Sequence, residues 1–351
     1  MQTRPSPDRL LRLDGLRGLA ACFISFVFHL RILFSQESNP LNGVPGLGWF
    51  QHWGWSMVDL FFVLSGFVFA HCYLDGWRLR AGTTISSFAL SRFARLWPLH
   101  AVSLACIILI LRDAPETTVA NAMTSLAMLH VFLPAPTQTL NGPAWSLSVE
   151  VFCYAVFILA ATAGARALRV SAVVAIFAGT YCIFALGAWE ALIGRGLLGF
   201  FCGVILRRYV KFADPIPGAV LIVPAALPFV IVPEGAWLIL TSVVAWPATI
   251  LLALRTKVLE SRVMIWFGDR SYSIYLIHVP VYLLAATAVS QLGELGRTGS
   301  MVATIMVWIL ILLIADLFYR HLEMPSQKAI LQWFRKREGG VQQPANALGM
   351  E

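Results

Sequence analysis

The chain has 351 residues, of which 58% are hydrophobic and 13% are charged, and its net charge is +8. A soluble domain is about half apolar and a quarter charged, so this composition excludes an ordinary soluble globular protein. A basic charge can indicate a nucleic-acid partner, but here the basic residues alternate with long apolar runs. Membrane topology explains that pattern better, and no nucleic-acid partner is expected.

The apolar residues lie in separate runs that are long enough to cross a bilayer. They predict an all-α, polytopic membrane protein with about ten transmembrane helices. The expected spans are residues 15–35, 55–75, 95–111, 145–163, 170–188, 192–208, 218–233, 236–254, 271–290 and 300–319. The six cysteines fall within these runs without a CxxC pair, which indicates neither a disulfide framework nor a metal site.

The distribution of lysine and arginine predicts the orientation of the chain. When the N-terminus is placed in the cytoplasm, most of the 26 Lys and Arg residues fall on the inner side. The positive-inside rule therefore places both termini in the cytoplasm. We expect residues 1–330 to form one transmembrane domain and residues 331–351 to form a basic, disordered cytoplasmic tail.

The first span carries two unusual residues, Arg17 near its inner end and His29 near its outer end. Charged or titratable side chains inside a membrane helix are costly, so a functional site is the default hypothesis. The two residues are twelve positions apart, which is roughly 18 Å along a helix axis. They cannot touch, so this helix would mark both ends of a path through the membrane.

Two further sets of charges accompany the spans. Arg92 and Arg95 are three residues apart and share a helix face, where two guanidinium groups would suit a phosphate-bearing ligand. Anchoring of the helix at the inner surface explains them equally well. Glu150 lies just inside the fourth span, where it would either orient His29 or pair with a nearby cation such as Arg31.

The ninth span carries a polar stripe. Tyr272, Tyr275 and His278 recur every three residues and therefore lie on one face of an apolar helix. They would either contribute to a binding path or form hydrogen bonds between helices. Asp59 lies at the outer end of the second span, where a packed helix with one acid at the membrane interface would explain it.

Taken in order, these segments resemble the membrane acyltransferase-3 family. The motifs are LDGLRGLA with a downstream histidine, DLFFVLSGF, RFARLWPLH, PAWSLSVEVFCY, SYSIYLIHVP and a Glu-x-Pro after the last span. The resemblance implies a ten-helix enzyme of the bacterial inner membrane that transfers an acyl group, most often acetyl, from acyl-CoA. The implied acceptors are hydroxyl groups of surface glycans such as O-antigen, exopolysaccharide, Nod factor or peptidoglycan.

The resemblance also assigns residues by position. Arg17 and His29 match the arginine and histidine of the first helix, Arg92 and Arg95 match an arginine pair of the third, and Glu150 matches the acid of WSLSxE. One departure concerns the first pair, because the family usually leaves ten residues between them and here there are eleven. Either a π-bulge absorbs the extra residue, or Arg17 and His29 face different directions.

A mechanism follows as a hypothesis. The arginines would hold the phosphates of acyl-CoA, which is a cosubstrate rather than a permanently bound cofactor, and His29 would act as general base on the acceptor hydroxyl. The candidate catalytic residues are His29, Glu150 and Arg17, and the candidate donor-binding residues are Arg92, Arg95, Tyr275 and His278. Direct transfer and an acyl-enzyme intermediate both remain open. The alternative is a glycan or lipid transporter, or flippase, whose polar residues line a substrate path.

Overall fold

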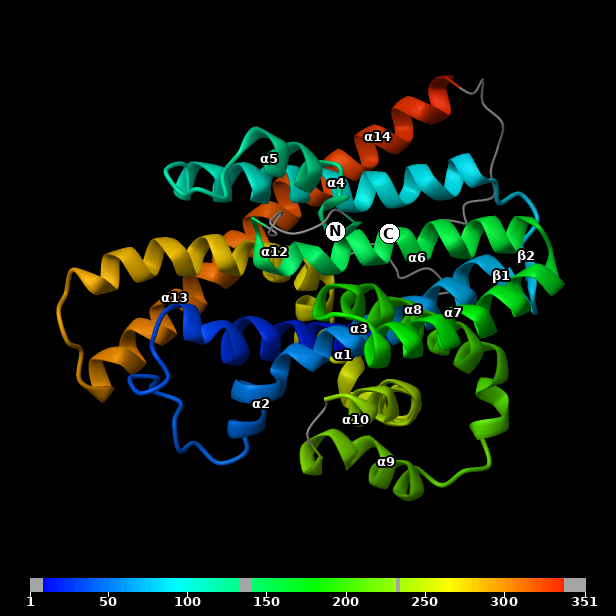
Figure 1. The fold of residues 1–351 in the computed structure, drawn as a ribbon, viewed down its shortest axis with the longest axis horizontal. Coiled ribbons are helices and arrows are strands. Elements are labelled where there is room, and N and C mark those ends of the chain that lie inside the picture. Colours follow the sequence, from blue (N-terminus) through cyan, green and yellow to red (C-terminus); the bar gives the residue numbers. More distant parts are fainter. Residues whose placement is uncertain (1–8, 133–139, 232–233, 338–351) are drawn as a thin grey trace.

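The computed structural model describes residues 9–132, 140–231 and 234–337, and their regular structure is almost entirely helical (Figure 1). A short antiparallel hairpin of β1 (Leu74–Asp75) and β2 (Arg78–Leu79) joins α3 to α4. The α-helices are α1 (Leu11–Cys22), α2 (Gly48–Trp53), α3 (Met57–Tyr73), α4 (Ile85–Ile110), α5 (Val119–Leu126), α6 (Trp145–Thr162), α7 (Ala165–Ala185), α8 (Ala188–Tyr209), α9 (Gly218–Val230), α10 (Ala236–Leu240), α11 (Trp246–Ala253), α12 (Arg262–Ser290), α13 (Arg297–Phe318) and α14 (Met324–Arg337).

Short segments of other helix types extend or connect these helices. Three are π-helical: η1 (Phe23–Phe28), η7 (Thr241–Ala245) and η9 (Tyr319–Glu323). The remaining six are 3-10 turns: η2 (His29–Ile32), η3 (Gly54–Ser56), η4 (His130–Phe132), η5 (Gly142–Ala144), η6 (Val210–Ala213) and η8 (Lys257–Glu260). Because π-turns are rare and often mark functional sites, the one that continues α1 is of particular interest.

Within the described residues, eight helical stretches are long and apolar enough to cross a membrane. They are Leu11–Ile32, Gly48–Tyr73, Ile85–Ile110, Gly142–Thr162, Ala165–Ala185, Ala236–Ala253, Arg262–Ser290 and Arg297–Phe334. The predicted spans 192–208 and 218–233 correspond to α8, which has charged residues near both ends, and to α9, which has only 13 residues. The helical membrane class is therefore supported, whereas the count of ten and the side of the termini stay predictions.

Several predicted boundaries need correction. The helix that contains the third predicted span, α4, begins at Ile85, ten residues before the predicted start, because Ser86, Ser87 and Ser91 make its first turns less apolar than a span. The helical stretch that begins at Arg297 continues through α14 to Arg337, so residues 331–337 of the expected tail are helical. The rest of that tail, residues 338–351, lies outside the described residues.

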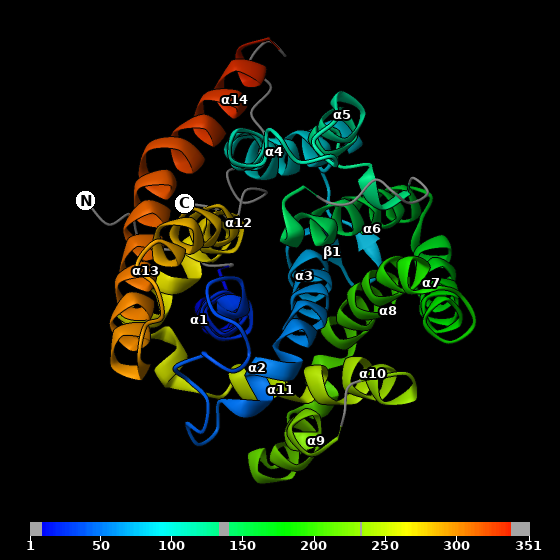
Figure 2. The same cartoon turned by 60° about the vertical axis from the view of Figure 1, so that its left-hand side comes forward.

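Helix α1 lies at the centre of the helix arrangement. In Figure 2 it is seen nearly end-on, with α3, α11 and α12 around it, and it packs most extensively against α12. Glycines allow this close approach, since a Cβ added to Gly18 would lie 2.6 Å from the backbone nitrogen of Gly268. Small residues are the usual means by which membrane helices approach each other. Gly66 and Gly203 play the same part where α3 packs against α8.

A buried ion pair also joins α3 to α8. Arg195 donates from Nε to Asp59 Oδ1 at 2.8 Å and from Nη2 to Asp59 Oδ2 at 3.0 Å. The Asp59 side chain is 0% exposed and that of Arg195 is 9% exposed. The guanidinium lies near the rings of Trp55 and Trp145, with ring centroids 4.6 and 4.9 Å away. Asp59 is thus a fully paired structural acid rather than an interfacial one.

Replacing Arg195 with methionine should destabilise the protein strongly, because it leaves the Asp59 carboxylate buried without its partner. A loss of about 3–5 kcal/mol is expected, and the double variant Arg195→Met/Asp59→Leu should recover most of it. Denaturation of the purified protein in detergent measures both. The control is Arg112→Met, which breaks an ion pair with Asp113 whose side chains are 77% and 89% exposed. Equal effects of Arg195→Met and Arg112→Met would contradict the structural role.

Candidate active site

A cavity of about 220 Å³ lies between α1, α3, α4, α6 and α12. Its wall includes five of the seven residues that the sequence singled out: Arg17, Arg92, Arg95, Glu150 and Tyr275. They come from four different helices, so the fold brings together residues that are up to 258 positions apart in sequence. The other two candidates, His29 and His278, lie beyond the cavity wall and form a pair of their own.

One end of the cavity is lined by a network of charges at the start of α1. Arg17 Nη1 donates to Asp14 Oδ1 at 3.2 Å, and Arg9 Nε donates to Asp14 Oδ2 at 2.7 Å. Arg9 also donates to Asp269 of α12. Asp14 therefore holds both arginines, and Arg9, Asp14 and Asp269 are site residues that the sequence analysis did not identify. Asp14 stands inside the LDGLRG motif, which was the available signal.

The paired arginines of α4 both line the cavity, as their spacing predicts. Arg92 is seven residues from the start of α4, about 10 Å along the helix axis. Its guanidinium lies 5.1 Å from the ring centroid of Phe69 and 5.8 Å from that of Tyr73. This aromatic setting favours a role inside the cavity over simple anchoring at the surface.

Glu150 also lies in the cavity wall, but its contacts differ from those predicted. Its Oε1 accepts hydrogen bonds from Ser65 Oγ at 2.7 Å and from the hydroxyl group of Tyr154. Glu150 therefore does not orient His29 in this structure, nor does it pair with Arg31, whose guanidinium lies over the ring of Phe28. The prediction was wrong because depth in the membrane does not fix the direction in which a side chain points.

His29 instead contacts His278 of α12. The distance between His29 Nδ1 and His278 Nε2 is 2.8 Å, and His278 Nδ1 lies 3.1 Å from the carbonyl oxygen of Ile274. The π-helical segment Phe23–Phe28 lies directly before His29, between it and Arg17. A π-bulge is thus present where the extra residue of this chain required one, which was one of the two explanations offered by the sequence.

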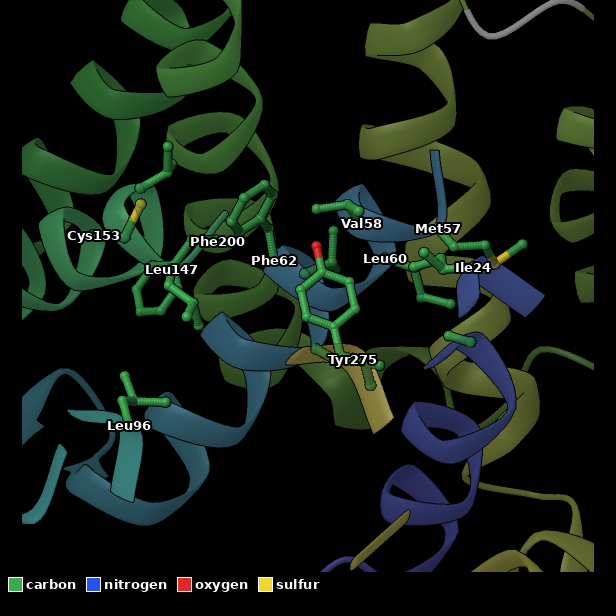
Figure 3. Close-up of a cluster of buried hydrophobic side chains, with 14 of the residues drawn as sticks. Ile24, Met57, Val58, Leu60, Phe62, Leu96, Leu147, Cys153, Phe200 and Tyr275 are labelled. Carbon is green, nitrogen blue, oxygen red and sulfur yellow. The ribbon is translucent and has the colours of Figure 1, made fainter. Parts of the chain in front are cut away.

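Tyr275 stands between the cavity and the histidine pair. Its hydroxyl donates to the carbonyl oxygen of Pro143 at 3.2 Å and lies 3.1 Å from Ser146 Oγ. Figure 3 shows the ring extending from α12 toward α3, between Val58 and Phe62, with the hydroxyl directed away from its own helix. Its ring centroid is 6.1 Å from that of His278. Tyr275 is therefore the cavity residue that lies next to the histidines.

The polar stripe of α12 therefore serves two purposes. Tyr272 and Tyr275 line the cavity, and Tyr272 also donates to the carbonyl oxygen of Leu96 at 2.5 Å. His278 is buried and engages His29 rather than the cavity. The stripe therefore forms hydrogen bonds between helices, as one of the two interpretations predicted, and it also lies beside the cavity. The contacts of His278 do not support its predicted role in donor binding.

A profile of an acyltransferase-domain family, acyltransferase-3, matches residues 10–320 of the chain. The chain belongs to the acyltransferase-3 family. It is accordingly a multi-pass helical membrane protein and an enzyme that transfers acyl groups, which confirms the resemblance seen in the sequence. The family assignment favours this activity over the transporter alternative.

Individual acyltransferase-3 relatives differ in how much they share with this chain. "Protein 2 in picA locus" of Rhizobium radiobacter is 38% identical over 48% of this chain and 93% of its own length. Acyltransferase MdmB of Streptomyces mycarofaciens is 31% identical over 43% of this chain and 40% of its own length. Peptidoglycan O-acetyltransferase OatA of Listeria monocytogenes is 22% identical over 93% of this chain and 57% of its own length. No solved structure matches this acyltransferase-3 chain.

Cys72 offers a test of which membrane face the cavity opens to. It lines the cavity at the end of α3, as Arg92 does from α4, and is half-buried. With the predicted orientation, a variant that keeps only Cys72 should react with a membrane-impermeant maleimide several-fold faster in inside-out vesicles than in right-side-out vesicles. A variant that keeps only Cys182, near the end of α7, should show the opposite preference. Faster labelling of Cys72 from the outer face would contradict the orientation.

Proposed function

We propose that this protein is an O-acyltransferase of the bacterial inner membrane. It moves an acyl group, most often acetyl, from acyl-CoA to a hydroxyl group of a cell-surface or secreted glycan. The observation that carries the proposal is the cavity of this acyltransferase-3 chain, where Arg17, Arg92 and Arg95 lie together with Glu150. In this scheme acyl-CoA is a cosubstrate, and no permanently bound cofactor is required.

The arginines fit the donor. Coenzyme A carries several phosphate groups, and guanidinium groups bind phosphate through paired, charge-assisted hydrogen bonds. Arg92 and Arg95 would hold these phosphates, and the positive-inside distribution places them toward the cytoplasm, where acyl-CoA is made. The pantetheine arm would then extend along the cavity toward Tyr275, which lines its wall beside the histidines.

His29 fits the role of general base. It lies at the end of the first span opposite Arg17. In the orientation that the positive-inside rule predicts, this is the outer end, from which an acceptor hydroxyl would approach. His29 would remove the proton of this hydroxyl while its oxygen attacks the thioester carbonyl carbon. The carbon–sulfur bond then breaks, and the coenzyme A thiolate leaves and takes up a proton. In this scheme the acyl group would come near Tyr275, the cavity-wall residue whose ring centroid lies 6.1 Å from that of His278.

The acceptor is proposed from the relatives. OatA is named as a peptidoglycan O-acetyltransferase, and its alignment covers 93% of this chain. This supports a glycan acceptor such as O-antigen or exopolysaccharide. Since the chain spans little more than half the length of OatA, the identity of the glycan is a matter for experiment.

The first test concerns His29. Replacement of His29 with glutamine should lower transfer of label from acetyl-CoA to glycan in sealed vesicles by about 10²–10⁴-fold, because the general base is lost. The matched control is His52→Gln in α2, which removes a histidine whose ring bonds only the Gly48 carbonyl among the described residues. This control should keep full activity. Full transfer by His29→Gln at normal protein level would overturn the proposed role.

The second test separates donor binding from surface anchoring. Arg92→Gln and Arg95→Gln should each raise the KM for acetyl-CoA about tenfold or more, since each loses a charged hydrogen bond to phosphate. The effect on kcat should be smaller. Arg78→Gln, in the exposed hairpin strand β2, is the control for a general loss of positive charge. An unchanged KM in both cavity variants, or an equal rise in Arg78→Gln, would favour anchoring.

A further inference from the structure

The contact between His29 and His278 determines which ring nitrogen carries the proton when both rings are neutral. His278 Nδ1 lies 3.1 Å from the carbonyl oxygen of Ile274, one helical turn earlier. A carbonyl oxygen can only accept a hydrogen bond, so the proton of a neutral His278 must be on Nδ1. Its Nε2 then carries a lone pair and no proton.

The same reasoning applies to the next ring. His278 Nε2 lies 2.8 Å from His29 Nδ1. Because Nε2 of His278 is the acceptor, Nδ1 of His29 must be the donor and carries the proton of the neutral ring. Nε2 of His29 is therefore left with a free lone pair. That nitrogen has no hydrogen-bond partner among the described residues, and it is not among their buried unpartnered polar atoms.

The surroundings favour the neutral form of both rings. His278 is 0% exposed, and besides His29 the rings of Tyr275 and Tyr282 lie near it, with centroids 6.1 and 6.2 Å away. The nearby cation is Arg31, two residues after His29 and over the ring of Phe28. Among the described residues, no carboxylate pairs with either imidazole. A protonated ring here would therefore be a buried charge without a partner of opposite sign, which is costly.

The geometry is held by the helices on both sides of the contact. His278 is fixed by α12, which packs closely on α1 at Gly18 and Gly268. His29 follows the π-helical segment Phe23–Phe28, which sets the rotation at which its ring leaves the helix. The hydrogen bond therefore joins two elements whose relative position is already determined.

We infer that His278 is a positioning residue that holds His29 in the tautomer with a proton on Nδ1 and a free lone pair on Nε2. This inference rests on the proposed function, in which His29 is the general base, and it names the base atom as Nε2. His278 acts only through His29. This positioning role replaces the role in donor binding that the sequence predicted for His278.

The direct test is the tautomer of His29 in the full-length protein in lipid. Nuclear magnetic resonance of protein labelled with ¹⁵N-histidine distinguishes protonated from unprotonated ring nitrogens, and loss of the signal in His29→Gln assigns it. The expected result for the wild type is a protonated Nδ1 and an unprotonated Nε2. A protonated Nε2 on His29 would overturn the inference while leaving the proposed function intact.

Two variants link the tautomer to catalysis. His278→Met keeps a side chain of similar length but offers no comparable acceptor, so it should lower kcat by about 10²-fold with an unchanged KM for acetyl-CoA. His278→Gln offers a carbonyl oxygen in its place and should restore most of the rate and the Nδ1-protonated signal. Equal rates for the Met and Gln variants would overturn the inference. If instead His29→Gln retains full transfer, the general-base role of His29 fails, and if the wild type transfers no label to glycan, the proposed function itself fails.

Discussion

The close packing of α1 on α12 is the constraint on which the site depends. Gly18 and Gly268 lack the Cβ atoms that would hold the two backbones apart, and a side chain at Gly18 would meet the backbone of α12 at 2.6 Å. This single helix pair supplies both ends of the proposed path. At one end, Asp269 of α12 accepts a hydrogen bond from Arg9, just before α1, and at the other, His278 meets His29.

The charges within the membrane domain fall into two kinds. Arg195 and Asp59 satisfy each other through two hydrogen bonds, are almost fully buried and lie between tryptophans, so they contribute to packing. The charges around the cavity are arranged differently, because they line an open volume and share partners, as when Asp14 binds both Arg9 and Arg17. A buried charge that costs free energy and faces a cavity is better explained by a ligand than by stability.

The sequence predicts the class of fold, singles out the arginines that line the cavity and offers a π-bulge as one of two explanations, but it does not give the direction of each contact. Hydropathy locates an apolar run, so it missed the polar first turns of α4. Residue counting did find the irregularity before His29, because one extra residue must be absorbed somewhere. Glu150 was assigned the wrong partner, since two helices at similar depth can have any relative rotation, and only tertiary packing decides that Ser65 and Tyr154 face its carboxylate.

Tyr275 addresses a difficulty that the sequence raised. Arg17 and His29 are roughly 18 Å apart along one helix, too far for one group to act at both positions. Tyr272 and His278 are six positions apart on α12, or about 9 Å along its axis, and so the stripe bridges half of that distance. Tyr272 and Tyr275 line the cavity, while His278 contacts His29. In the proposed function, donor and base would therefore approach each other from opposite ends of this stripe and would meet at Tyr275, one helical turn from the histidine pair.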